Sequence, residues 1–223
     1  MRIKLNFNGT IELFNGSTQH LVNGFIHSVL GSNNKYHDSF SNYAVSSLQG
    51  GKLVEGGISY ENGAYIFVSS NDLEFNDNIM IGLMTTTSTI GSLTLNNIEI
   101  VDFKPHFYYD VVRTISPILL KDNDSIITFK DSSFIDVLLK KTKKKLLSLG
   151  LKEKDVNTLD IQPFHFENAK LKYVKVKNVV NLSSQVMLII KGDIEVRRKL
   201  YEMGLGKSTG CGFGSVEIIE TNI

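Results

Sequence analysis

Hydrophobic and polar positions follow the period of a strand at the start of the chain and then the period of a helix. Between residues 2 and 7 every second position is apolar, which predicts a strand with one buried face. Between residues 21 and 30 apolar positions recur at helical spacing, which predicts a helix that ends at Gly31. Further strands are predicted at residues 43–48, 53–60, 64–69, 91–95 and 98–103, and a second helix at residues 73–84.

The same order of elements follows in the second half of the chain. Strands are predicted between residues 109 and 121 and at residues 164–177, 179–191 and 215–220, with helices at residues 133–149 and 195–203. Both halves therefore follow the order β-α-β-β-α-β, which is typical of ferredoxin-like domains. We predict an α+β fold of two tandem ferredoxin-like domains, at residues 1–103 and 104–223. The halves share no sequence repeat, so this prediction depends on the order of elements alone.

Charge is distributed unevenly between these halves, although the net charge is only +1. Residues 1–103 carry 4 Lys and Arg against 9 Asp and Glu, whereas residues 104–223 carry 20 against 14. A basic half is typical of a protein that binds a polyanion such as RNA, although a lysine-rich surface in contact with solvent alone gives the same balance. The single cysteine excludes an intrachain disulfide and a cysteine zinc site. Because the chain shows neither a membrane-length apolar stretch nor a signal peptide, we expect a cytosolic protein without membrane partners.

The most informative segment is GLGKSTGCGFG at residues 204–214. Glycine permits positive φ and lacks Cβ, so successive N–H groups can turn toward a phosphate. The segment is not a P-loop, because Tyr201 stands where the first glycine is required, and it follows a helix rather than a strand. It is not a dinucleotide-binding fingerprint either, since the third glycine is missing. The candidate phosphate-binding residues are Gly204, Gly206, Lys207, Ser208, Thr209, Gly210, Gly212 and Gly214.

The glycine-rich segment also resembles a known signature. Gly-Leu-Gly, five residues that include a cation, and Gly-Phe-Gly come directly before the last predicted strand. This arrangement resembles the signature loop of the repeat-associated RNA-binding (RAMP) superfamily of CRISPR proteins, particularly its Cas-six endoribonucleases. The stretches TISPILLK at residues 114–121 and LVNGFIHSVLGSNNKYHDSFSNYAVSSL at residues 21–48 resemble other parts of that family. The resemblance implies tandem ferredoxin-like domains with RNA bound across them, and an enzyme that cuts CRISPR repeat RNA in precursor transcripts to give guide RNAs.

Such cleavage needs no metal or cofactor, because the substrate's own 2′-OH is the nucleophile, and it leaves a 2′,3′-cyclic phosphate and a 5′-OH. A general base and a general acid are required, and histidine suits both roles because its pKa lies near neutrality. The resemblance assigns these roles to His37, in the polar loop after the first helix, and to His27 on that helix. The apolar neighbours of His27 fit a packed, structural imidazole as well. The cation that some family members carry a few residues after the histidine is missing here, and Lys35 or Lys52 is the candidate substitute. We expect His20, His106 and His165 to be surface or structural residues.

RNA binding is expected from the basic half. The alternation of a strand places Lys170 and Lys172 on one face and Lys175 and Lys177 on the other. The helix before the glycine-rich segment adds two arginines, and a lysine cluster at residues 140–145 fits a helix face in contact with solvent. The additional candidate RNA-binding residues are Arg197 and Arg198.

An alternative is a non-catalytic RAMP subunit that holds guide RNA inside a CRISPR effector complex. Such a protein would share the fold and the glycine-rich loop, so the loop cannot separate the two functions. The partners expected from the resemblance are CRISPR repeat RNA and other Cas proteins of an effector complex, and the protein is expected to be a monomer or a homodimer.

Overall fold

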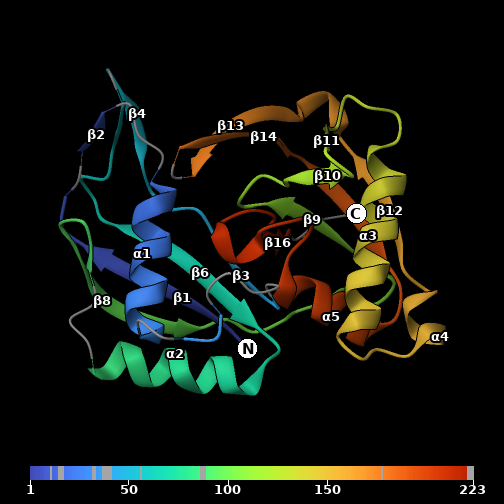
Figure 1. The fold of residues 1–223 in the computed structure, drawn as a ribbon, viewed down its shortest axis with the longest axis horizontal. Coiled ribbons are helices and arrows are strands. Elements are labelled where there is room, and N and C mark those ends of the chain that lie inside the picture. The colour runs from blue at the N-terminus through green and yellow to red at the C-terminus, as the bar shows by residue number, and fades with distance from the viewer. Residues whose placement is uncertain are drawn as a thin grey trace.

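In the computed structural model the two largest sheets of the protein are antiparallel, are each covered by helices and lie side by side (Figure 1). The structure describes residues 1–10, 12–14, 18–31, 34–36, 42–55, 57–85, 89–176 and 178–219. Among these residues, no helix has the length and apolar character needed to cross a membrane.

The first half forms a ferredoxin-like unit. Its sheet has the order β3-β6-β1-β8-β7, so the first strand lies between the third and the last strand of the β-α-β-β-α-β unit. Helices α1 and α2 pack on this sheet, and a Cβ atom on Gly82 of α2 would lie 1.9 Å from the carbonyl oxygen of Val29 in α1. Glycine is therefore needed where the two helices cross. The elements are β1 (Arg2–Asn8), α1 (Gln19–Leu30), β3 (Tyr43–Val45), β6 (Ala64–Ser70), α2 (Leu73–Thr85), β7 (Thr89–Ile90) and β8 (Leu93–Ile100).

A smaller three-stranded sheet stands beside this unit, built from β2 (Glu12–Phe14), β5 (Gly57–Ser59) and β4 (Lys52–Val54). The sequence predicted one strand at residues 53–60, and this was wrong. Val54 pairs with Gly57, so the chain reverses between them and forms a hairpin. The sequence does contain a signal for this turn, since two adjacent glycines, here at positions 56 and 57, are typical of a hairpin.

The second half repeats the ferredoxin-like arrangement, with the sheet order β12-β15-β9-β16 and the helices α3 and α5. It adds two hairpins, β10–β11 and β13–β14. The elements are β9 (Tyr109–Thr114), β10 (Leu120–Asp122), β11 (Ser125–Ile127), α3 (Phe134–Ser148), α4 (Glu153–Val156), β12 (Asp160–Phe164), β13 (Lys170–Val176), β14 (Val179–Gln185), β15 (Met187–Lys191), α5 (Ile194–Met203) and β16 (Val216–Ile218).

Two long strands predicted from the sequence are each divided in the structure. The run at residues 164–177 is interrupted by His165, whose φ is +48°, and by the 3-10 helix Phe166–Asn168. The run at residues 179–191 changes sheet at Val186: β14 pairs with β13, whereas β15 pairs with β9 and β12. The fold class is nevertheless as predicted, an α+β protein with two tandem ferredoxin-like units. The domain boundary at residue 103 stays a prediction.

A buried arginine joins the two units. The guanidinium of Arg2 lies between the rings of Phe67 and Tyr201, at 4.4 and 4.3 Å from their centroids, and Nη1 donates to the carbonyl oxygen of Val216 at 2.6 Å. Burial lowers the pKa of Arg2. Because Phe67 belongs to the first unit and the other two residues to the second, this contact helps to fix the position of one sheet against the other.

Candidate nucleic-acid interface

The glycine-rich loop that follows α5 packs tightly between the two units. A Cβ atom on Gly212 would lie 1.8 Å from Nε2 of Gln19 at the start of α1, and one on Gly214 would lie 1.7 Å from the carbonyl oxygen of Leu205. Both glycines also have positive φ, at 86° and 63°, a region that other residues rarely enter. Glycine is therefore required at these positions for close packing, independently of any ligand.

Much of the loop is closed to a ligand. The N–H of Gly204 donates to the carbonyl oxygen of Leu200 at 2.9 Å, and the N–H of Gly214 donates to that of Pro117 at 3.0 Å. Both of these glycines are buried. The other two buried glycines of the loop are Gly210 and Gly212. We therefore remove these four glycines from the phosphate-binding surface expected from the sequence.

The tip of the loop remains accessible. Lys207 is exposed, Gly206 and Ser208 are half-buried, and the N–H of Lys207 donates to the carbonyl oxygen of Leu119 at 2.8 Å. Ser208 has a φ of +58°, a conformation unusual for a residue with a side chain and enriched at ligand-binding sites. The tip thus presents one ammonium group on a backbone that is anchored at its base.

Thr209 and Lys145 tie the loop to both units from inside. The Thr209 hydroxyl donates to the carbonyl oxygen of Tyr43 in β3 at 2.8 Å, and Nζ of Lys145 donates to this hydroxyl at 3.3 Å and to the carbonyl oxygen of Met203 at 3.1 Å. Burial lowers the pKa of Lys145 from 10.5 to about 8. Thr209 is completely buried, so we remove it from the RNA-contacting residues and assign it a structural role.

Lys145 was missed in the sequence, where it was grouped with lysines expected to face solvent. Its side chain is on the buried stripe of α3 that also contains Leu138 and Thr142. These positions are four and three residues apart, which is the spacing of one helix face. The helical period therefore contained the signal that separates Lys145 from the other lysines of the cluster.

His37, the first candidate for catalysis, lies outside the described residues, and its role stays a prediction. Tyr36 and Tyr43 lie on either side of the segment 37–41. The rings of Tyr36 and Tyr43 are 6.1 Å apart and both contact the ring of Phe75. The carbonyl oxygen of Tyr43 also accepts the hydrogen bond from Thr209. The flanks of the predicted catalytic segment are therefore anchored beside the glycine-rich loop.

His27 is half-buried on α1. The two lysines suggested as the missing catalytic cation are both engaged elsewhere: Lys35 pairs with Glu74, which raises the pKa of Lys35, and Lys52 pairs with Glu61 at 3.2 Å. Both ion pairs are exposed to solvent, so they do not exclude either lysine, and the identity of the transition-state cation stays a prediction.

The three other histidines lie in separate segments, on α1, before β9 and after β12. His20 is exposed on α1. His106 donates its backbone N–H to Asp110 at 2.8 Å. His165 follows the end of β12 rather than opening a strand, and its Nδ1 lies 2.8 Å from Oε1 of Glu167.

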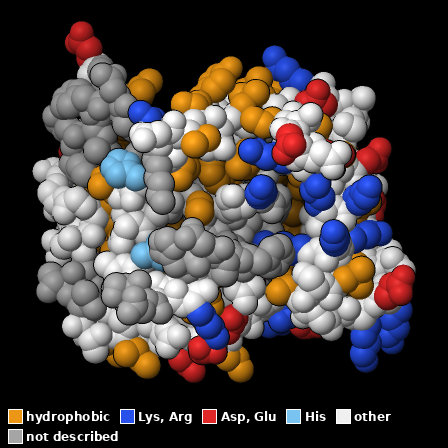
Figure 2. Space-filling view, viewed as in Figure 1, with side chains coloured by type: hydrophobic (Ala, Val, Ile, Leu, Met, Phe, Trp, Pro, Cys, Tyr) orange, Lys and Arg blue, Asp and Glu red, His pale blue; other side chains and the backbone are white. Residues whose placement is uncertain are grey.

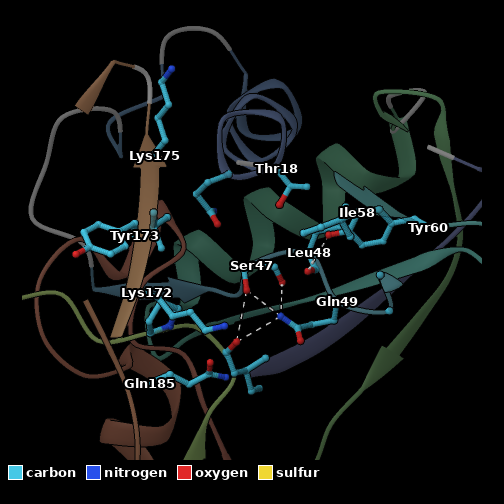
Figure 3. Close-up of a pocket in the computed structure, with 16 residues that line it drawn as sticks. Thr18, Ser47, Leu48, Gln49, Ile58, Tyr60, Lys172, Tyr173, Lys175 and Gln185 are labelled. Carbon is cyan, nitrogen blue, oxygen red and sulfur yellow. Dashed lines mark hydrogen bonds between the residues drawn. The ribbon is translucent and has the colours of Figure 1, made fainter. Parts of the chain in front are cut away.

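A cleft of about 630 Å³ lies between the two units, next to the loop (Figure 3). One wall belongs to the first unit and carries neutral polar groups. Nε2 of Gln49 donates to the Ser47 hydroxyl at 2.8 Å, and the Ser47 N–H donates to the Ser116 hydroxyl at 2.7 Å. Ile115 and Pro117 of the second unit also line the cleft. Since Pro117 also accepts a hydrogen bond from the loop, one segment supports both the cleft and the loop.

The opposite wall is one edge of the β13–β14 hairpin. The four consecutive residues 172–175 all line the cleft, and β14 is the only strand of the described residues that pairs with β13. This wall carries two cations, Lys172 and Lys175, and the ring of Tyr173, which is 75% exposed. Lys170 lies outside the cleft at the base of the hairpin, and Lys177 is outside the described residues. Figure 2 shows Lys and Arg side chains gathered over the second unit, as the uneven charge predicted.

The two arginines on α5 have different surroundings. Arg197 is buried and forms an ion pair with Asp110 at 2.7 Å, and it also donates to the carbonyl oxygens of Gly192 and His106. An arginine held in this way cannot reach RNA, so we remove Arg197 from the candidate interface. Arg198 is about half exposed and remains a candidate, with Glu195 at 3.4 Å. These two arginines are adjacent in the sequence, but the helical period places them on different faces of α5.

The fold is that of a tandem ferredoxin-like protein. The glycine-rich loop packed between the two units, together with the lysine-lined cleft beside it, forms a candidate nucleic-acid interface. The family described as CRISPR associated protein Cas6, C-terminal, matches residues 99–218, more than half of the chain. The chain belongs to the Cas6 family.

Individual proteins agree with this assignment. CRISPR-associated endoribonuclease Cas6 1 of Methanocaldococcus jannaschii is 29% identical over 203 residues, which cover 82% of this chain and 76% of that protein. A solved structure described as CRISPR associated protein Cas6 has a TM-score of 0.81 and 22% identity, covering 99% of both chains. A RAMP protein described as binding different RNA substrates has a TM-score of 0.80 and 22% identity, covering 99% of this chain and 100% of that one. These two structures share the fold of this chain.

Proposed function

We propose that this protein is a metal-independent endoribonuclease that cuts CRISPR repeat RNA in precursor transcripts to give guide RNAs. The observation that carries the proposal is the position of the cleft. Its lysine-lined wall, the exposed tip of the glycine-rich loop and the flanks of the segment that contains His37 all surround the junction of the two units. Membership of the Cas6 family and the similarity to an archaeal endoribonuclease of that family support the same function.

The proposed chemistry uses the RNA itself as nucleophile. A general base removes the proton from the 2′-OH, whose oxygen attacks the adjacent phosphorus, and a general acid protonates the departing 5′-oxygen. The bond from phosphorus to that oxygen breaks, which leaves a 2′,3′-cyclic phosphate and a 5′-OH. We assign the acid and base roles to His37 and His27. Each role typically contributes about a hundred- to ten-thousand-fold in rate.

The binding groups are assigned from their exposure. The RNA backbone would pass along the edge of β13, where Lys172 and Lys175 line the cleft, and continue to Lys207 at the tip of the loop. Tyr173 supplies a ring on which an unpaired base can stack. Each phosphate contacted should steepen the salt dependence of binding.

A cleavage assay tests this function. The purified protein is incubated with repeat RNA in an excess of EDTA, and the ends of the products are determined. Cleavage at one position with a 2′,3′-cyclic phosphate supports the proposal. Tight binding with intact RNA would contradict it and favour the non-catalytic RAMP subunit of an effector complex.

A further inference from the structure

A second hollow lies beside the cleft, at the base of the β13–β14 hairpin. It has a volume of about 190 Å³ and lies where the hairpin leaves the sheet of the second unit. Three basic side chains line it, from three separate elements: Arg113 in β9, His165 after β12 and Lys170 at the start of β13. None of the described residues that line it is one to which we assign catalysis.

The two hollows adjoin along one face of the hairpin. Lys170 lines the second hollow and Lys172 lines the cleft, and the period of two places both on the same face of β13. Gln185 pairs with Lys170 across the hairpin and lines both hollows. A strand of RNA that leaves the cleft past Gln185 would therefore reach the second hollow without crossing the hairpin.

The basic side chains of the second hollow are accessible. The side chains of Arg113 and His165 are 57% and 54% exposed, and Lys170 is exposed and has no ion pair with the described part of the chain. Nε of Arg113 donates to Glu217 at 2.7 Å, and His165 lies beside Glu167. Ion pairs this exposed contribute little to stability, so a phosphate can replace a carboxylate partner at small cost. Arginine is also suited to two parallel hydrogen bonds with a phosphate.

We propose that this second hollow binds the phosphate backbone of the RNA where it extends beyond the cleft, with Arg113, His165 and Lys170 as ligands. This inference rests on the proposed function, because the ligand is the same RNA. It predicts that RNA flanking the segment in the cleft adds affinity, and that this part of the affinity depends strongly on salt.

The test compares a long and a short RNA in binding assays at several salt concentrations. Both RNAs carry a 2′-deoxy nucleotide at the cut position so that they stay intact. The flanks of the short RNA are removed step by step, until further shortening no longer changes the salt dependence of its binding. The variant combines Arg113→Gln with Lys170→Gln. The control is Lys154→Gln, which removes the same kind of charge from the exposed surface of α4. Lys170→Gln is also tested alone. It breaks no ion pair with the described residues, so weaker RNA binding by this variant would not result from misfolding.

On the long RNA we expect the double variant to bind several-fold more weakly, with a salt slope lower by about 1.4, or roughly 0.7 per phosphate contact to a single strand. On the short RNA it should match the wild type. Glu217→Gln should tighten binding of the long RNA alone, because it frees Arg113. Equal slopes for the wild type and the double variant on long RNA would overturn the inference while leaving the proposed function intact. A wild type that neither binds nor cuts repeat RNA would refute the proposed function itself.

Discussion

Lys145 gives a prediction whose sign and size follow from the structure. Burial lowers its pKa from 10.5 to about 8, so below pH 8 the folded protein holds a buried ammonium group. A difference of 2.5 pKa units corresponds to a cost of about 3 kcal/mol at pH 7. Between pH 8 and pH 10.5 the unfolded chain binds the proton more strongly than the folded one, so stability rises with pH. From pH 7 to pH 9 the gain is about 1 kcal/mol.

The assay is urea unfolding at pH 7, 8 and 9 for the wild type, for Lys145→Met and for Lys144→Met as an exposed control on the same helix. The free energy of unfolding of the wild type should rise by about 1 kcal/mol relative to Lys145→Met between pH 7 and pH 9. The control should follow the wild type. If the difference between the wild type and Lys145→Met is the same at all three pH values, the reasoning about this buried amine is wrong.

Three further predictions concern the site. His37→Ala should abolish cleavage and leave RNA affinity within a few-fold, as measured by single-turnover cleavage and by binding, and a normal rate would remove His37 from catalysis. Lys207→Ala should weaken RNA binding and lower the salt slope by about one, whereas an unchanged slope would exclude a phosphate contact. Gly214→Ala should cost about 1–3 kcal/mol in thermal unfolding, because the new Cβ meets the backbone at 1.7 Å. Gly150→Ala is its control, since Gly150 has φ +83° with open space around it, and an equal loss in both variants would contradict the packing argument.

Much of the fold could be predicted because its elements have a clear period. The helix that ends at Gly31 and the strand from Arg2 are where the apolar pattern placed them, and the order of elements yields the two ferredoxin-like units. Two of the errors, in the runs at residues 164–177 and 179–191, occur where one apolar run serves two sheets. Val186 continues the pattern of its neighbours, yet β14 and β15 pair with different strands on either side of it. Pairing depends on contacts distant in the sequence, which the local pattern does not contain.

The site was only partly predictable for a related reason. The glycine-rich segment was found from its composition, but that composition could not show that Gly212 packs against Gln19, nearly two hundred residues away. The cleft has no local signal at all. Gln49 and Lys172 face the same space because two distant segments meet, and neither lies in a recognisable motif. The difference between Arg197 and Arg198, by contrast, could have been predicted from the sequence, because the helical period separates the buried position from the exposed one.

The most direct test of the proposed function is the effect of one oxygen atom in the substrate. Repeat RNA with a single 2′-deoxy nucleotide at the cut position is compared with unmodified RNA in EDTA, after binding assays confirm that the protein binds both equally. The proposed mechanism predicts rapid cleavage of the unmodified RNA and no cleavage of the 2′-deoxy RNA, since the nucleophile is missing. Cleavage of both RNAs at similar rates would show that water or another group attacks the phosphorus, and the mechanism proposed for this protein would be wrong.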